Sequence, residues 1–267
     1  MSGLRVGVAQ LAATRDKEAN LARAGDLIAA AARDGAEAVV LPEYAMAYDP
    51  RPDAASFAAD AEPLDGPFVT GLAGHARSHG VTVVAGVLER GTDGERPANT
   101  LVALGPDGTL LAAYRKVHLY DAFGDRESDR LRAADPVATV VPAGGLRLGL
   151  MTCYDLRFPE MARFLVDAGA DVLLVPAAWV AGPLKADHWR TLLRARAIEN
   201  TAYVVGAGMT GPRCTGRSVV VDAAGQVLAE LGEDPGHAVV DLDPDDVARV
   251  RADNPSLANR RFDVRPR

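Results

Sequence analysis

The sequence has few cysteines and no long apolar run, and both shortages narrow what the protein can be. Its 267 residues include only two cysteines, Cys153 and Cys214, which lie far apart and form no C-x-x-C pair. Disulfide frameworks and structural zinc sites need more closely spaced cysteines, so we expect neither. No stretch approaches the ~18 consecutive apolar residues of a membrane span. The N-terminal segment also lacks the apolar core of a signal peptide, which predicts a cytoplasmic protein without a membrane partner.

Positive charge and metal-binding patterns are also scarce. The formal net charge is -7 and the sequence pI is about 5.3. Nucleic acids and anionic membranes attract clustered Lys and Arg, so we expect neither as the main partner. The densest basic run, Arg190 to Arg196, has helical spacing and is interpreted as a helix face. The five histidines form no H-E-x-x-H pair and the aspartates no calcium loop, so we expect no metal and no cofactor.

What the chain does contain is a regular alternation of strand and helix patterns. With 48% hydrophobic residues and no visible linker, residues 1–267 are predicted to form one domain with a large core. Alternating strands and helices are typical of layered α/β domains. Strands are expected at 4–10, 38–41, 81–87, 100–104, 109–114, 147–151, 172–176, 202–206, 218–222 and 226–230, and helices at about 17–34, 67–79, 159–168 and 187–200.

Three segments of the first half return in the same order in the second half. Two such halves, each a sheet covered on one side by helices, would pack sheet to sheet as a four-layer αββα sandwich with pseudo-symmetric halves. The matching pairs are DGAEAVVLPEY (34–44) with AGADVLLVPAA (168–178), VTVVAGV (81–87) with TAYVVGA (201–207), and LVALGPDGTLLAAY (101–114) with SVVVDAAGQVLAEL (218–231).

Three reactive side chains each follow an apolar run, which places them at or just beyond strand ends. They are Glu43, Lys116 and Cys153. A cysteine attacks only as thiolate and needs a base or a cation beside it. A carboxylate can take the thiol proton, and an ammonium can stabilise the oxyanion of a tetrahedral intermediate. The set therefore indicates an amide-cleaving thiol enzyme.

The residues around Cys153 favour a nucleophile over core packing, the ordinary role of a lone buried cysteine. The segment CYDLRFPE is too polar to continue a core strand and fits a turn into a helix that begins near Pro159. Helix-start amides are expected to lower the pKa of the thiol. The backbone N–H of Tyr154 is expected to help hold the oxyanion.

Lys116 and Arg115 must point to opposite faces because the segment leaves a strand. The one that points inward needs carboxylate partners, for which Glu43 and Glu127 are the candidates. Alone, Glu43 and Lys116 would be an ordinary loop carboxylate and a surface cation. A solvated-loop role for Glu127 remains an alternative. His118, on the same face as Lys116, is interpreted as a supporting hydrogen-bonding group and not as a base.

The motifs resemble those of the nitrilase superfamily, the carbon-nitrogen hydrolases, over most of the chain. They are PEY (42–44), YRKVHL (114–119), RES (126–128), CYDLRFPE (153–160) and HWRTLLRARAIEN (188–200). The resemblance implies the same four-layer fold and amide hydrolysis through a thioester. It makes Glu43 the general base, Lys116 the oxyanion stabiliser, Cys153 the nucleophile and Glu127 a second carboxylate near the lysine. A homodimer or larger homo-oligomer is also expected.

The substrate is predicted less closely than the reaction. The resemblance favours the small-amide branch, which includes omega-amidases and deaminated glutathione amidases; a nitrilase or an N-carbamoyl hydrolase is the alternative on the same fold. The stretch 179–185 differs from the omega-amidase pattern. Ala178 and Trp179 are expected in a pocket wall, although Trp179 fits core packing equally well. Arg213 is a candidate carboxylate anchor or a surface residue.

One motif points to another class of protein. Gly206, Gly208 and Gly211 match G-x-G-x-x-G directly after an expected strand, as in a dinucleotide-binding oxidoreductase. Such a turn must open a helix, whereas here Pro212 and Gly216 lead into another expected strand. We therefore interpret the glycines as a loop near the pocket.

Overall fold

Two six-stranded β-sheets form the centre of the computed structural model, which describes residues 3–92 and 94–267. The first sheet has the order β12-β1-β2-β3-β4-β5, and the second has the order β11-β10-β9-β8-β7-β6. The strands are β1 (Leu4–Gln10), β2 (Ala38–Val40), β3 (Thr82–Glu89), β4 (Ala98–Leu104), β5 (Leu110–Arg115), β6 (Val140–Ala143), β7 (Leu146–Leu150), β8 (Val172–Ala177), β9 (Tyr203–Gly208), β10 (Val219–Val221), β11 (Val227–Glu230) and β12 (Gly236–Leu242).

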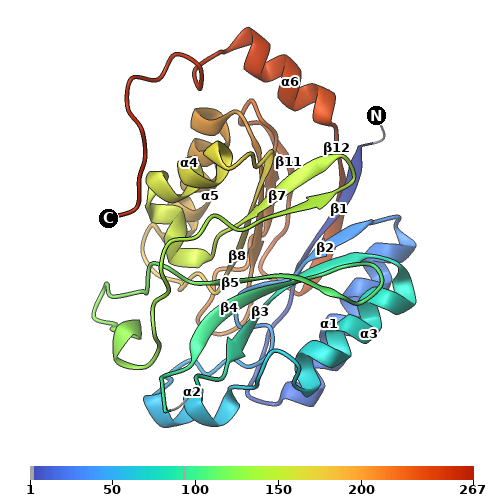
Figure 1. Cartoon of the computed structure of the whole chain (residues 1–267). Helices are drawn as coiled ribbons and strands as arrows, with labels where there is room; N and C mark the ends of the chain where they lie inside the picture. Colours follow the sequence, from blue (N-terminus) through green and yellow to red (C-terminus); the bar gives the residue numbers. More distant parts are fainter. Residues whose placement is uncertain (1–2, 93) are drawn as a thin grey trace.

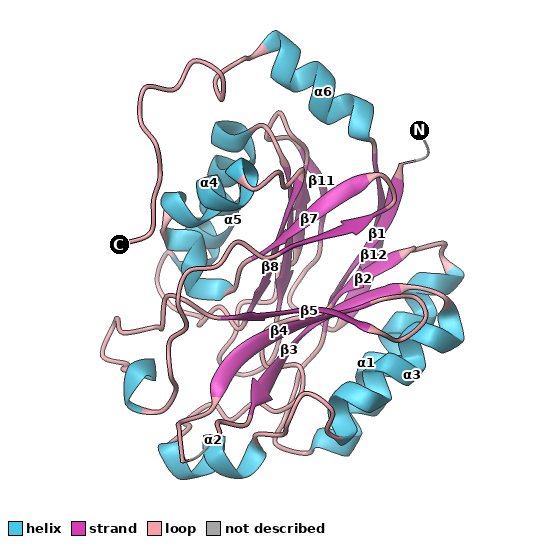
Figure 2. Ribbon diagram, viewed as in Figure 1, coloured by secondary structure: helices cyan, strands magenta, loops and turns pink. Residues whose placement is uncertain are grey.

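Helices cover the outer face of each sheet, so the layers run helix, sheet, sheet, helix as predicted (Figures 1 and 2). Helices α1 (Lys17–Arg33) and α3 (Pro67–His79) lie on the first sheet, and α4 (Pro159–Asp167) and α5 (Lys185–Asn200) on the second. The short α2 (Ala54–Asp60) and α6 (Pro244–Asp253) lie at the periphery. Among the described helices, none combines the length and the apolar character needed to cross a bilayer.

Successive side chains of a strand point to opposite faces of its sheet. Strands that are apolar on both faces therefore contribute to two apolar layers. Val6 and Val8 of β1 face the second sheet and share a core with Leu148 of β7, whereas Val39 of β2 packs outward with Ile28 of α1. All five are fully buried. The interface between the two sheets is therefore as fully buried from solvent as the interfaces between sheets and helices.

The two halves have the same topology, which confirms the internal repeat. In the first half β1, β2 and β3 are parallel and β4 and β5 continue antiparallel; in the second half β7, β8 and β9 are parallel, followed by antiparallel β10 and β11. Each half gains one further antiparallel strand on its first strand, β12 on β1 and β6 on β7.

The sequence prediction missed α2, β6, β12 and α6, and the last three have weak patterns for physical reasons. Strand β6 contains Pro142, which only an edge strand tolerates. Most of β12 is half-buried, so its residues do not alternate between polar and apolar. Helix α6 buries only Val247, and a helix with so small an apolar face gives little periodicity. The predicted strands are otherwise confirmed with ends shifted by one or two residues.

Gly86 of β3 lets the chain after β2 approach the sheet. A Cβ at Gly86 would lie 2.5 Å from Glu43 Cα and 2.7 Å from Tyr44 N. Both are backbone atoms, which cannot swing aside as a flexible side chain can. The position of the Glu43 backbone therefore depends on a residue without a side chain in the neighbouring strand.

Gly86→Ala should lower the free energy of unfolding by about 1–3 kcal/mol, the usual effect of forcing a methyl group into a packed site. Gly74→Ala in α3 is the matched control, because no atom lies within 4 Å of a Cβ there. Since alanine is favoured over glycine inside helices, that variant should be as stable as the wild type or more so. Urea unfolding measures both. Equal destabilisation, or none, would contradict the close approach at Gly86.

Candidate active site

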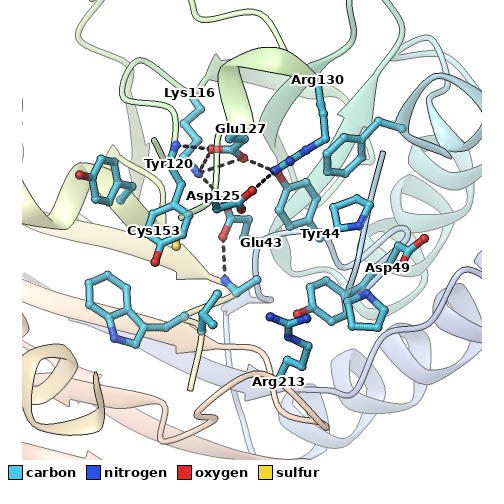
Figure 3. Close-up of a pocket in the computed structure, with 18 of the residues that line it drawn as sticks. Glu43, Tyr44, Asp49, Lys116, Tyr120, Asp125, Glu127, Arg130, Cys153 and Arg213 are labelled. Carbon is cyan, nitrogen blue, oxygen red and sulfur yellow. Dashed lines mark hydrogen bonds and ion pairs between the residues drawn. The ribbon is translucent and has the colours of Figure 1, made fainter. Parts of the chain in front are cut away.

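Segments from both sheets bring the three predicted reactive residues into one pocket (Figure 3). Glu43 lies just beyond β2, Lys116 follows β5 directly, and Cys153 begins the short 3-10 helix η2 (Cys153–Arg157) after β7. All three line the pocket, as does Glu127, the first residue of the 3-10 helix η1 (Glu127–Asp129). Residues that are far apart in the sequence thus meet where the loops of the two sheets face each other.

Lys116 is buried between two carboxylates. Its Nζ lies 2.9 Å from Glu43 Oε1 and 2.9 Å from Glu127 Oε2. The exposed fractions are 2% for Lys116, 1% for Glu43 and 4% for Glu127, so the solvated-loop interpretation of Glu127 is wrong. Arg115 faces the other way and pairs with Glu89, 2.6 Å away, as the alternation predicted. Three charges are therefore held together out of water.

The charged groups of this set shift the pKa values of Lys116 and Glu127. Burial works to lower the pKa of Lys116, but the carboxylates of Glu127 and Glu43 outweigh it and raise that pKa well above its usual value. Burial likewise works to raise the pKa of Glu127, but Lys116 and hydrogen bonds from Tyr44 and Tyr120 lower it. Lys116 is therefore an ammonium and Glu127 a carboxylate across the neutral pH range.

Two further donors fix the orientation of Glu43. Asn99 Nδ2 donates to Glu43 Oε1 at 2.7 Å, and the backbone N–H of Ala178 donates to Glu43 Oε2 at 2.7 Å. Asn99 also lies 3.4 Å from Glu127 Oε1, so one amide spans both carboxylates. The sequence analysis missed Asn99, although a fully buried asparagine inside the apolar strand β4 is a usable signal, because such a group needs partners.

Glu127 is held by groups close to Glu43 and Lys116 in the chain. Tyr44, the residue after Glu43, donates its hydroxyl to Glu127 Oε1. The backbone N–H of Tyr120 donates to Glu127 Oε2 at 2.6 Å. Burial, followed by the charges of Glu127 and Glu43, raises the pKa of Tyr44 well above its usual range, so this residue stays a neutral donor. Every polar contact of Glu127 therefore restrains the carboxylate relative to the lysine.

Cys153 occupies a strained turn and is 8% exposed. Its φ is 45°, in the left-handed region that non-glycine residues enter at a cost of about 1–3 kcal/mol. Burial and then the Glu43 carboxylate raise the pKa of the thiol well above its usual value, while Lys116 opposes them. The pKa of the thiol is therefore raised and not lowered as expected from helix-start amides, because burial and then the Glu43 charge dominate.

The start of η2 places a backbone donor without an intrahelical acceptor beside the thiol. Tyr154 is the second residue of this 3-10 helix, so its backbone N–H has no acceptor within the helix. The body of η2 is fixed by Arg196 of α5, whose Nε and Nη2 donate to the Leu156 carbonyl at 3.0 and 2.7 Å. A strained cysteine, a free amide and a rigid support thus occupy one short turn.

The predicted wall residues line the pocket, and Trp179 also packs. Ala178 and Trp179 follow β8, and the Trp179 indole N–H donates to the Lys185 carbonyl at 2.8 Å. The Trp179 ring lies 5.3 Å from the ring of Trp189, so its two interpretations both hold. Arg213 lines the pocket from an exposed loop.

Two cations of the pocket were not anticipated as wall residues. Arg157 has buried Nε and Nη2 atoms with no hydrogen-bond partner among the described residues, and its guanidinium lies 4.8 Å from the Trp179 ring centre. Lys185 is 8% exposed and donates to Tyr120 Oη at 3.1 Å. Burial, and then the charge of Arg157, lower the pKa of Lys185. Arg157 was visible in the sequence as part of CYDLRFPE, but the direction in which its side chain points was not.

The glycine motif does not form a dinucleotide-binding turn. Strand β9 continues through Gly208, and Gly211 and Gly216 belong to a loop that leads into β10. The described part of the chain has no helix between β9 and β10, so the alternative that required one is wrong. Within residues 3–92 and 94–267, no group of three or more His, Cys, Asp or Glu side chains is placed to hold a metal ion.

Comparisons with known proteins show what the chain is similar to. Residues 5–252 match the family described as carbon-nitrogen hydrolase. The chain is 41% identical over 257 residues to the deaminated glutathione amidase of Escherichia coli O157:H7, an alignment that covers 96% of this chain and 97% of that protein. It is 39% identical over 266 residues to a hydrolase of Mycobacterium tuberculosis strain H37Rv, covering 93% of this chain and 92% of that one.

Solved structures share the fold over nearly the whole chain. The C. elegans NitFhit protein superposes with a TM-score of 0.90 at 32% identity, covering 98% of this chain and 66% of that longer protein. A mutant amidase from Nesterenkonia sp. AN1 superposes with a TM-score of 0.79 at 32% identity, covering 97% of this chain and 94% of that one. In that structure the acetamide moiety of fluoroacetamide is covalently added at the active-site cysteine.

The raised pKa of Cys153 predicts slow alkylation of the resting protein at neutral pH. The rate at which iodoacetamide modifies Cys153 should increase as the pH rises above the usual thiol value of 9.0, because only the thiolate reacts. Peptide mapping by mass spectrometry separates this signal from Cys214, whose pKa burial raises to about 11. Fast, pH-independent alkylation below pH 8 would instead indicate a resting thiolate–ammonium pair.

Proposed function

The chain belongs to the carbon-nitrogen hydrolase family, and on that premise we propose that Cys153, Glu43 and Lys116 carry out its hydrolysis of small amides through a thioester. The observation that supports these roles best is the buried Glu43–Lys116–Glu127 set beside the thiol. Cys153 is the nucleophile, Glu43 the general base and acid, and Lys116 the cation of the oxyanion site. Glu127 holds Lys116 in place.

The first half of the reaction forms the thioester. The amide carbonyl oxygen enters between Lys116 Nζ and the Tyr154 N–H, and the sulfur of Cys153 bonds to the carbonyl carbon while Glu43 takes the thiol proton. Because the pKa of the thiol is raised, the proton stays on sulfur until attack, so the base is required at that moment. The tetrahedral intermediate collapses as Glu43 returns the proton to nitrogen, the C–N bond breaks, and ammonia or an amine leaves.

The second half uses the same groups on water. Glu43, again a carboxylate, takes a proton from a water molecule whose oxygen bonds to the thioester carbon. The same oxyanion site holds the new intermediate, which releases the acid and the Cys153 sulfur, and the proton returns to the sulfur. One carboxylate thus serves both halves, as its contacts to Lys116 and to the Ala178 N–H allow.

The cations of the pocket support a substrate that carries a carboxylate. Both Arg157, which is half-buried, and Lys185, which is buried, line it beside aromatic rings and without a carboxylate partner among the described residues. A cation removed from water is costly unless an opposite charge compensates it. A substrate carboxylate would supply the missing charge. Relatives that include the E. coli protein are named deaminated glutathione amidases, so we include deaminated glutathione, an amide with carboxylate groups, among the candidate substrates.

We also propose the domain organisation, the oligomeric state and the location of the enzyme. We expect residues 1–267 to behave as one domain, the protein to form a homodimer or larger homo-oligomer, and its location to be the cytoplasm. A nitrile or N-carbamoyl substrate would use the same thiol chemistry. A panel of amides, nitriles and N-carbamoyl amino acids, assayed for released ammonia, decides among these substrates.

Cys153→Ala and Cys153→Ser should abolish amide hydrolysis while the far-ultraviolet circular dichroism stays unchanged, because the nucleophile is lost and little volume changes. Cys214→Ala is the matched control and should retain activity. In the wild type, hydroxylamine added during turnover should intercept the thioester as a hydroxamate, and quenched enzyme should show the acyl mass on the Cys153 peptide. An active Cys153→Ala enzyme would overturn the proposed function.

Glu43→Gln should separate thiol reactivity from catalysis. Loss of the base should reduce turnover by at least ~10²-fold. Loss of the negative charge that raises the pKa of Cys153 should at the same time speed alkylation by iodoacetamide at neutral pH, since Lys116 remains. Turnover and alkylation are measured on the same preparations. A variant in which both rates fall together would argue that Glu43 has a structural role only.

A carboxylate on the substrate should matter through Lys185. We expect kcat/KM for succinamate to exceed that for butyramide, which has a methyl group in place of the carboxylate, by about 10- to 100-fold, the effect of one hydrogen bond to a charged group. Lys185→Met should remove most of that preference and leave butyramide hydrolysis within about 3-fold. Lys17→Met, at a lysine paired with Glu62 away from the pocket, is the control. Equal rates for both amides would contradict this prediction.

A further inference from the structure

Asp155 is a fully buried carboxylate that no step of the proposed reaction uses. It lies two residues after Cys153, in η2, and does not line the pocket. We propose that Asp155 is a positioning residue that fixes the Lys116 ammonium relative to the Cys153 sulfur, acting through Tyr114 and His118. This inference rests on the proposed roles of Lys116 and Cys153.

On the lysine side, Asp155 binds the residues that flank Lys116. Tyr114 Oη donates to Asp155 Oδ2 at 2.6 Å, and His118 Nδ1 lies 2.7 Å from Asp155 Oδ1. The backbone N–H of His118 also donates to Oδ1, at 3.2 Å. Strand β5 ends at Arg115 and residues 117–118 form a bend, so the same carboxylate binds the chain on both sides of Lys116.

On the cysteine side, Asp155 closes the strained turn. The backbone N–H of Thr152 donates to Asp155 Oδ2 at 2.8 Å, and Cys153 follows with a φ of 45°. Left-handed non-glycine residues persist only where the surrounding structure holds them. The bond from Thr152 and the bonds from Tyr114 and His118 share one carboxylate. Any shift of the turn therefore moves the lysine segment with it.

The surroundings of His118 favour a supporting role over direct proton transfer. Its ring stacks on Phe158 with a centroid distance of 3.8 Å and an interplanar angle of 8°. His118 is not among the residues that line the pocket. The ring stacks on Phe158 and bonds to Asp155, so its orientation is fixed outside the pocket. Its contribution to the reaction is therefore positional.

The distance between Lys116 Nζ and the Cys153 sulfur matters. The substrate oxyanion must lie within hydrogen-bonding distance of the ammonium at the moment when the sulfur bonds to the carbonyl carbon. A displacement of about 1 Å at reacting groups can reduce a rate by about 10²-fold. Such a displacement leaves the substrate-binding walls in place, so it should reduce kcat and leave KM nearly unchanged. Loss of folded protein would instead reduce the amount of active enzyme without changing the kinetics of the remainder.

The test removes the two side-chain donors one at a time. Tyr114→Phe and His118→Leu should each lower kcat by about 10- to 100-fold with KM within about 3-fold, measured on enzyme quantified by active-site titration of Cys153. His118→Asn should recover most of kcat, because its Nδ2 can donate where His118 Nδ1 does. His237→Leu, which breaks a surface pair with Asp34, is the matched control and should keep the wild-type kcat. Asp155→Asn should be at least as impaired as either single-donor variant.

Two results would overturn the inference. One is a wild-type kcat in both Tyr114→Phe and His118→Leu. The other is a His118→Asn enzyme as slow as His118→Leu, which would mean that ring packing and not the hydrogen bond matters. Failure of the proposed function is distinguishable, because it appears as an active Cys153→Ala enzyme whatever the Tyr114 and His118 variants do.

Discussion

The Lys116 ammonium lies out of water between the carboxylates of Glu43 and Glu127, and the site is arranged around the need to keep these three charges together. A buried ion costs several kcal/mol unless its partners and hydrogen bonds are well placed. Asn99, Tyr44 and the Tyr120 and Ala178 amides supply those bonds. The set carries a net charge of -1, which favours a neutral thiol at rest.

That charge count also explains why the reaction can proceed in a buried site. In the proposed mechanism, the proton neutralises Glu43 when sulfur attacks, and a new negative charge develops on the substrate oxygen beside Lys116. The total remains -1, and the charge moves only from one acceptor of the ammonium to another. No net charge enters the low-dielectric pocket, so the barrier is spared the desolvation of a second anion. Glu127 stays charged throughout and retains the lysine when Glu43 is protonated.

The internal repeat, together with the resemblance to the carbon-nitrogen hydrolases, predicted the four layers and the grouping of Glu43, Lys116, Glu127 and Cys153. The sequence did not predict Asn99 or the partners of Asp155, since those contacts join strands and loops far apart in the chain. The direction of the thiol pKa was also wrong. Helix-start amides are visible in a sequence, but burial and the distance to a carboxylate are not.

Strand β12 belongs to the sheet of the first half, where it pairs along the whole of β1, from Leu4 opposite Leu242 to Gln10 opposite Gly236. Translation at about 5–20 residues per second separates the synthesis of these two strands by roughly 10 to 50 s. During that interval the first sheet cannot be completed, and β1 presents an unpaired edge of the kind that other chains can join. The nascent first half therefore has an open template until β12 has left the ribosome.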